Sequence, residues 1–387
     1  WSKIGNSSST SSAQRETRAI ILWMVALTIG CTSPEEKKAT PVELRSSEVS
    51  VMTYNVENLF DAEDDPNKRD ETYLPVELKS STRHQILCKT ISRQKWQEEC
   101  LEWDWDETVV KQKLRRLANV IESVDGGRGP DILVLQEVEN QSILERLNRE
   151  HLSHLNYETE VLLEGADSRG IDVALLSRLE TAGKPDLHPI QFRSIKDERK
   201  QDTRGILEVP LRLPNGETLI VFGVHFPAPF HPTKMRFQAF QSLNRLASNR
   251  SDNVYKISAG DFNVPQEEVV SSQILQKSVQ GDWLIAHLLG CKGCKGTYYY
   301  SPKKSWSFLD MILLSKHFKP SKMNTSQDET EFVAQWVLDP SSIKVIATQP
   351  NQVNRLGFPQ SFELPGPRGV SDHLPLFLKI KRREAQE

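Results

Sequence analysis

Short apolar runs recur along the chain from residue 49 onward and predict a series of β-strands. The runs are rich in Val, Ile and Leu, and turn-forming residues bound most of them. Some are apolar throughout, as strands buried on both faces are, and others alternate apolar with polar residues. Pro214, Asn215 and Gly216 predict a hairpin turn between two of the runs. The predicted strands cover residues 49–56, 131–138, 172–177, 205–213, 218–226, 254–262, 308–315 and 374–380.

Between these strands, apolar residues that recur every three or four positions predict amphipathic helices. The clearest pattern lies in residues 110–124, where Val110, Leu114 and Leu117 fall on one side of a helix. Strands that alternate with covering helices indicate a layered α/β or α+β domain. Two further helices are predicted over residues 141–151 and 233–247.

Two segments interrupt the alternation. Residues 61–106 are polar and charged, and residues 319–367 are irregular and end in a stretch rich in Pro and Gly. We predict that both are insertions in a single domain that spans residues 48–383. No tandem repeat is visible in the sequence.

Residues 1–47 have a different character. Arg15 and Arg18 precede an apolar run, residues 19–29, and Cys31 follows it closely. A basic flank and a short apolar core are typical of an export signal, and the run is short for a membrane span. The position of Cys31 predicts a lipoprotein whose lipidated cysteine anchors it to the cell envelope, followed by a flexible tether. Simple secretion and a plain anchor helix are the alternatives.

The remaining cysteines agree with export. Cys88, Cys100, Cys291 and Cys294 form an even set, which in a non-reducing compartment indicates two disulfides. The simplest pairing is Cys88 with Cys100 and Cys291 with Cys294. A single zinc site made of all four thiolates is the alternative, although the spacing is a poor match.

The composition limits which classes of molecule the protein can be expected to bind. The chain has 387 residues and a formal net charge of −3, so it carries no overall basic field that would attract nucleic acid. Any site for a polyanion must therefore be a local patch or use a metal ion. We expect a monomer.

Polar and ionisable residues stand at the ends of most predicted strands. Asp310 is the least ordinary, because it interrupts an apolar run where an unpartnered carboxylate would be costly, and His373 could be its partner. The set comprises Asn55, Glu57, Gln136, Glu137, His225, Asp261, Asn263, Asp310, Asp372 and His373.

Taken in order, these residues form the motifs N-x-E, Q-E, V-H-F, G-D-F-N, L-D and S-D-H between residues 49 and 380. In this order and spacing they resemble the endonuclease/exonuclease/phosphatase superfamily. The resemblance implies an α+β fold, a four-layer α/β/β/α sandwich with two packed, mainly antiparallel sheets. It also implies hydrolysis of phosphate esters with the help of a divalent metal.

The resemblance further implies a metal site for Mg²⁺ or Mn²⁺, which prefer hard oxygen ligands. Glu137 would be the principal ligand, with Asn55 and Glu57 beside it. Asp372 would contact a metal from the other side.

The same resemblance assigns the catalytic roles. Asp261 would orient and deprotonate the attacking water. Asn263 and His225 would donate hydrogen bonds to the phosphate oxyanion. Asp310 would hold His373 in one tautomer and favour its cationic form.

Three residues are candidates for substrate binding. Arg169 and Arg204 each precede a Gly at a strand entrance and could hold phosphates, or they could form ordinary surface salt bridges. Trp306 lies in a loop, residues 291–308, that interleaves lysines with aromatic residues, as single-strand binders do. The alternative is that these aromatic rings pack against the edge of the sheet.

The leading functional prediction is an exported, metal-dependent nuclease or phosphodiesterase that acts on nucleic acid or another phosphoester. A phosphatase or a sphingomyelinase-like phospholipase is the first alternative. A module that binds phosphate without catalysis is the second.

Overall fold

The computed structural model describes residues 42–196, 203–279, 281–319, 335–366 and 368–383. Residues Thr40–Glu387 form one compact unit. The predicted export signal and Cys31 lie outside the described residues. Among the helices that the structure describes, none is both long enough and apolar enough to cross a membrane.

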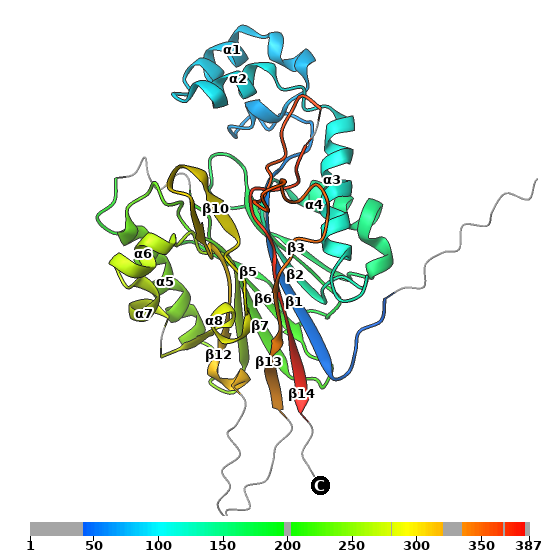
Figure 1. Ribbon diagram of the computed structural model, residues 1–387, viewed down its shortest axis with the longest axis vertical. Helices are drawn as coiled ribbons and strands as arrows, with labels where there is room; N and C mark the ends of the chain where they lie inside the picture. The colour runs from blue at the N-terminus through cyan, green and yellow to red at the C-terminus, as the bar shows by residue number, and fades with distance from the viewer. Residues whose placement is uncertain (1–41, 197–202, 280, 320–334, 367, 384–387) are drawn as a thin grey trace, which may run out of the picture. The chain divides into compact units, whose positions relative to one another are not determined.

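Two six-stranded sheets form the centre of the unit (Figure 1). In each sheet, all neighbouring strands are antiparallel except one parallel pair, β1 with β2 and β7 with β8. The first sheet has the order β13 (Gln335–Val345), β14 (Leu376–Arg383), β1 (Glu48–Leu59), β2 (Ile132–Val138), β4 (Asp172–Ser177) and β3 (Thr159–Leu162). The second has the order β5 (Asp186–His188), β6 (Ile206–Arg212), β7 (Thr218–His225), β8 (Tyr255–Asp261), β12 (Asp310–Ser315) and β9 (Trp283–Ile285).

Helices cover the outer faces of the two sheets. Figure 1 shows α3 and α4 on one side and α5, α6 and α7 on the other. Helix α3 begins after Asp106, whose side chain accepts a hydrogen bond from the Val109 N–H, and Asn140 caps α4 in the same way. The helices are α1 (Thr82–Lys89), α2 (Gln94–Glu102), α3 (Glu107–Glu122), α4 (Gln141–Arg146), α5 (Thr233–Ser248), α6 (Gln266–Ser271), α7 (Ile274–Ser278) and α8 (Ala286–Gly290).

Three apolar clusters separate the layers. One lies between the sheets and includes Val134 of β2 and Val221 of β7. A second joins α3 to the first sheet, and a third joins α5 to the second sheet. Because each strand buries both faces, the central strands read as nearly continuous apolar runs. The arrangement confirms the predicted four-layer α/β/β/α sandwich.

The connection between β1 and α3, residues 61–106, carries helices α1 and α2. The disulfide Cys88–Cys100 joins these two helices, and a second disulfide joins Cys291 to Cys294. Both predicted pairings are confirmed, and no thiolate of this set remains to form the alternative zinc site. We call residues 61–106 the β1–α3 connection.

The sequence analysis is wrong about part of the second predicted insertion. Residues 335–345 are not irregular, because they form strand β13, which pairs with β14 at the edge of the first sheet. Asp339, Pro340 and two serines interrupt its apolar pattern, and the register shifts there. The short strands β3, β5 and β9 and a hairpin of β10 (Tyr298–Tyr300) and β11 (Ser305–Ser307) were also not predicted.

Candidate active site

Three ionisable side chains lie side by side in the second sheet. The strand register pairs His225 of β7 with Asp261 of β8, and Asp261 with Asp310 of β12. Residues that are paired across a ladder project to the same face of a sheet. The Nε2 atom of His225 is accordingly 3.6 Å from Oδ2 of Asp261.

The end of β8 explains the segment Gly260–Asn263. A Cβ on Gly260 would lie 1.9 Å from the Val224 carbonyl oxygen, so only glycine fits before Asp261. Asn263 has a φ of 52°, and its backbone N–H donates to Oδ1 of Asp261 at 2.7 Å. The turn therefore ends the strand and fixes the Asp261 carboxylate at its tip.

His373 completes this group from the first sheet. Its Nδ1 lies 2.7 Å from Oδ2 of Asp310, and its Nε2 lies 3.9 Å from Oδ2 of Asp261. Burial alone would lower the pKa of His373, but Asp310, Asp372 and Asp261 outweigh it and raise this pKa well above its usual value. This shift favours the cationic form of the imidazole.

Burial has opposite effects on two other members of the group. It raises the pKa of Asp261 to about 7, with His373 acting against this shift and Asp310 adding to it. It lowers the pKa of His225 well below the usual value, and the nearby Arg204 and Arg169 lower it further. His225 is thus neutral beside a carboxyl group that titrates near neutral pH.

The first sheet contributes an amide and a carboxylate. Asn55 of β1 stands opposite Gln136 of β2, and both strands change register directly after this pair. Glu137 has a φ of 67° at that irregularity, which turns its side chain toward the site. The Asn55 Nδ2 donates to Glu137 and to Asp261, at 3.2 Å in each case.

Glu57 and Asp372 meet beside this pair. Glu57 Oε2 accepts hydrogen bonds from the backbone N–H groups of Phe362, at 2.9 Å, and of Asp372, at 3.1 Å. Burial and the neighbouring Asp372 raise the pKa of Glu57 to about 8. Burial also raises the pKa of Asp372, and Glu137 contributes to that rise.

This corner suits a divalent cation. Three carboxylates from distant parts of the chain, Glu57, Glu137 and Asp372, meet here. In addition to burial, the charge of Asp372 raises the pKa of Glu57, and the charge of Glu137 adds to the rise at Asp372, so their repulsion is a penalty on the ionised forms. A hard cation would remove that penalty, and oxygen donors are what Mg²⁺ and Mn²⁺ prefer. The compact set Asp261, Asp310 and His373 is a poorer candidate, because the imidazole and Asp310 already bind each other.

The two candidate arginines share one acidic partner. Arg204 lies 3.2 Å from Asp167 and is almost completely buried, whereas the side chain of Arg169 lies 3.5 Å from Asp167 and is 40% exposed. Arg169 also lines a cavity of about 750 Å³ together with Glu57, Glu137 and Asp372. Arg169 can therefore reach a ligand in the cavity, whereas the buried Arg204 is not among the residues that line it.

Trp306 is placed differently from the other candidates. It is not among the residues that line the cavity. Its ring packs against Tyr299, with the centroids 5.3 Å apart, and against Phe358, at 5.9 Å. Trp306 thus belongs to a cluster with Tyr299 and Phe358 outside the cavity lining, and its predicted role in substrate binding stays a prediction. In the same hairpin, Tyr298 lies closer to the site, because its ring is 4.9 Å from that of His373.

Lys113 is the main residue that the sequence analysis missed. Its side chain is fully buried, and Nζ donates to the backbone oxygens of Glu57, at 2.9 Å, and Val370, at 2.8 Å. Burial lowers its pKa to about 8, against the attraction of Glu57 and Asp372. A signal was present in the sequence, since Lys113 interrupts the apolar face of α3 between Val110 and Leu114.

The comparisons agree with this fold and identify a family. A model of the Endonuclease/Exonuclease/phosphatase family matches residues 50–93 and 97–382. The fold is similar to that of humanized TDP2 from D. rerio, with a TM-score of 0.52 and 14% identity over 87% of this chain and 100% of that one. It is also similar to that of a mannosyl-6-phosphatase from Bacteroides thetaiotaomicron, with a TM-score of 0.50 and 16% identity over 87% of this chain and 100% of that one. No curated protein sequence matches the chain significantly.

Proposed function

The chain belongs to the endonuclease/exonuclease/phosphatase family, whose members hydrolyse phosphoester bonds and generally depend on a divalent metal, and from that premise we propose that it is a phosphodiesterase dependent on Mg²⁺ or Mn²⁺ that works outside the cytoplasm. One observation carries the proposal. The carboxylates of Glu57, Glu137 and Asp372 lie together beside the group formed by His225, Asp261 and His373.

Glu57, Glu137 and Asp372, with the Asn55 amide beside them, would hold the cation. When bound, it would polarise a phosphoryl oxygen and stabilise the negative charge on the leaving oxygen. Arg169, which lines the cavity, would bind the phosphate and keep it in place.

Asp261 would accept the proton from the water that attacks phosphorus, because its pKa of about 7 allows both protonation states near neutral pH. His373 would donate from Nε2 to a phosphate oxygen, since Asp310 occupies its Nδ1. Asn263 uses one N–H of its amide on the Phe226 carbonyl and has a second for the phosphate. The buried, neutral His225 would supply a further donor.

The two disulfides support the extracytoplasmic part of the proposal, because disulfides persist in non-reducing compartments. Mapping of non-reduced peptides from the protein isolated from its cells would test it. Free thiols at Cys88 and Cys291 would contradict export.

A phosphomonoesterase is the second candidate. Acidic side chains outnumber basic ones in the cavity lining and would disfavour a long polyanion there. The acidic residues are Glu57, Glu71, Glu99, Glu137, Glu363 and Asp372, and the basic residues are Arg69, Lys95 and Arg169. A small monoester avoids that repulsion. The similarity to a mannosyl-6-phosphatase agrees with this candidate, although it concerns the fold alone.

The test is hydrolysis by the purified protein with Mg²⁺ or Mn²⁺. The panel contains bis(p-nitrophenyl) phosphate, p-nitrophenyl phosphate, plasmid DNA, RNA and sphingomyelin. We expect diester hydrolysis that EDTA abolishes and that Asp261→Asn lowers about 10²-fold or more. Asp282→Asn, at an exposed site, is the matched control. Equal activity in Asp261→Asn and the wild type would refute the assigned site, and binding without turnover would indicate a non-catalytic module.

A further inference from the structure

The cavity at the candidate active site has a wall that the proposed reaction does not use. The β1–α3 connection forms this wall, and its aromatic residues Tyr73, Trp96 and Trp103 line the same cavity as Glu57 and Glu137. An aromatic surface that is continuous with the proposed metal ligands can contact whatever is attached to the phosphate. The wall is therefore in a position to select substrates.

Trp96 of α2 is the most accessible of these rings, because 49% of its surface is exposed. The Arg93 guanidinium lies over the ring, 4.2 Å from its centroid. Trp96 lines the cavity, whereas Arg93 is not among the lining residues. Phe230, which follows β7 and is 69% exposed, adds a second accessible ring to the cavity lining.

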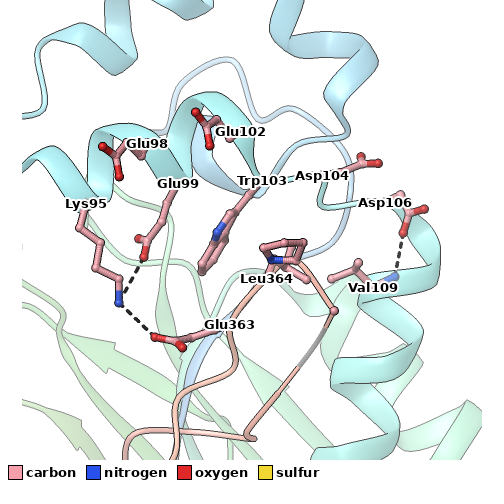
Figure 2. Close-up of a pocket in the computed structure, with 12 residues that line it drawn as sticks. Lys95, Glu98, Glu99, Glu102, Trp103, Asp104, Asp106, Val109, Glu363 and Leu364 are labelled. Atoms are coloured by element: carbon pink, nitrogen blue, oxygen red, sulfur yellow. Dashed lines mark hydrogen bonds and ion pairs between the residues drawn. The ribbon is translucent and has the colours of Figure 1, made fainter.

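The wall is fixed to the rest of the unit. The disulfide Cys88–Cys100 joins α1 to α2, and the Nζ of Lys95, next to Trp96, lies 3.1 Å from Oε1 of Glu363 and 3.5 Å from Glu99 (Figure 2). These contacts hold helix α2, and so the backbone of Trp96, in place before a ligand binds, which limits the ordering that binding requires.

Charge limits what the wall can bind. Figure 2 shows a neighbouring pocket, which Glu98, Glu102, Asp104 and Asp106 line together with Lys95. Lys95 is already engaged by Glu99 and Glu363. An uncharged flat group is accepted at such a surface more readily than additional phosphates.

We propose that the β1–α3 connection is a substrate-selecting wall, in which Trp96 stacks on a flat aromatic group on the part of the substrate that stays attached to the phosphate, as a nucleoside phosphoester carries its base through the sugar. This inference rests on the proposed phosphodiesterase function. Trp96 also lies at the break between the two stretches that match the family model, residues 50–93 and 97–382. The selecting residue is thus a feature of this chain that the family pattern does not describe.

Two diesters with the same leaving group test the wall. Thymidine 5′-(p-nitrophenyl phosphate) carries a base, and methyl p-nitrophenyl phosphate carries none. We expect Trp96→Ala to raise KM for the thymidine ester about tenfold, because stacking on a base is worth that much. For the methyl ester, KM and kcat should not change. Trp96→Phe should restore most of the loss, and Tyr300→Ala, which removes an exposed ring outside the cavity, is the matched control.

The outcomes separate the two proposals. Equal effects of Trp96→Ala on both esters, or no effect on either, would overturn the substrate-selecting wall while leaving the phosphodiesterase intact. If the wild type hydrolyses neither ester, the proposed function fails. The wall is then tested by calorimetric titration with thymidine 5′-monophosphate and methyl phosphate, where equal affinity of the wild type for both would refute it.

Discussion

At the scale of single residues, burial sets the protonation states of the candidate active site. It raises the pKa of Asp261 and lowers that of His225, although the two side chains lie only 3.6 Å apart. His373 departs from this trend because three carboxylates surround it. Neighbouring groups thus receive different protonation states from their surroundings, which is the arrangement that acid–base chemistry needs.

Asp310→Asn tests the role of the buried carboxylate. The change keeps the shape of the side chain but removes the charge that holds His373 cationic. We expect kcat for a diester to fall about 10²-fold, with little change in KM. Because the two side chains act as a unit, the double variant with His373→Ala should be no slower than His373→Ala alone. Additive losses would show that Asp310 acts independently of His373.

Lys113→Met tests the buried lysine. The variant keeps most of the side-chain volume but leaves the carbonyl oxygens of Glu57 and Val370 without their donor. We expect the free energy of unfolding to fall by about 2–3 kcal/mol and the metal concentration for half-maximal activity to rise. Lys111→Met, on the exposed side of the same helix, is the control. Chemical denaturation that places both variants at the wild-type midpoint would contradict this account.

At the scale of elements, hydrophobic periodicity was sufficient to predict a strand or helix where that element is long and buried. It predicted β7, β8 and α3 because their neighbours cover a continuous apolar run or one apolar face. It failed for β13, an edge strand whose polar turn breaks the alternation. The strand-end residues were found from their order in the sequence, whereas the roles of Lys113 and Trp96 depend on contacts between segments that periodicity does not encode.

The short helix α8 gives a prediction about pH. His287 of α8 stacks on Phe308, with ring centroids 4.1 Å apart, and burial lowers its pKa to about 4. The unfolded chain binds this proton near pH 6.5, so stability is present above that pH and is lost as the pH falls toward 4. We expect this residue to account for about 1–2 kcal/mol of the loss between pH 7 and 5. Urea titrations of His287→Leu should show a correspondingly smaller loss, and an identical loss would count against the burial effect.

At the scale of the whole molecule, the fold brings together groups that are far apart in the sequence. Glu57 lies near the end of β1, Glu137 lies near the end of β2, and Asp372 precedes β14 near the other end of the sequence. The neighbouring strands β14, β1 and β2 place all three at the same end of the strands of the first sheet. Only the native state holds these carboxylates close together, so only the native state should bind a cation at this site.

Thermal unfolding measures that difference directly. A cation that binds the native state alone stabilises it by about 2.7 kcal/mol at a hundred times its dissociation constant. We therefore expect Mg²⁺ or Mn²⁺ to raise Tm relative to NaCl of the same ionic strength, and EDTA to reverse the rise. Glu137→Gln should remove most of the metal-dependent increase, whereas Glu145→Gln, at an exposed position of α4, should retain it. If Glu137→Gln and the wild type gain equally in Tm, the cation binds elsewhere on the protein, and the assignment of Glu57, Glu137 and Asp372 as its ligands is wrong.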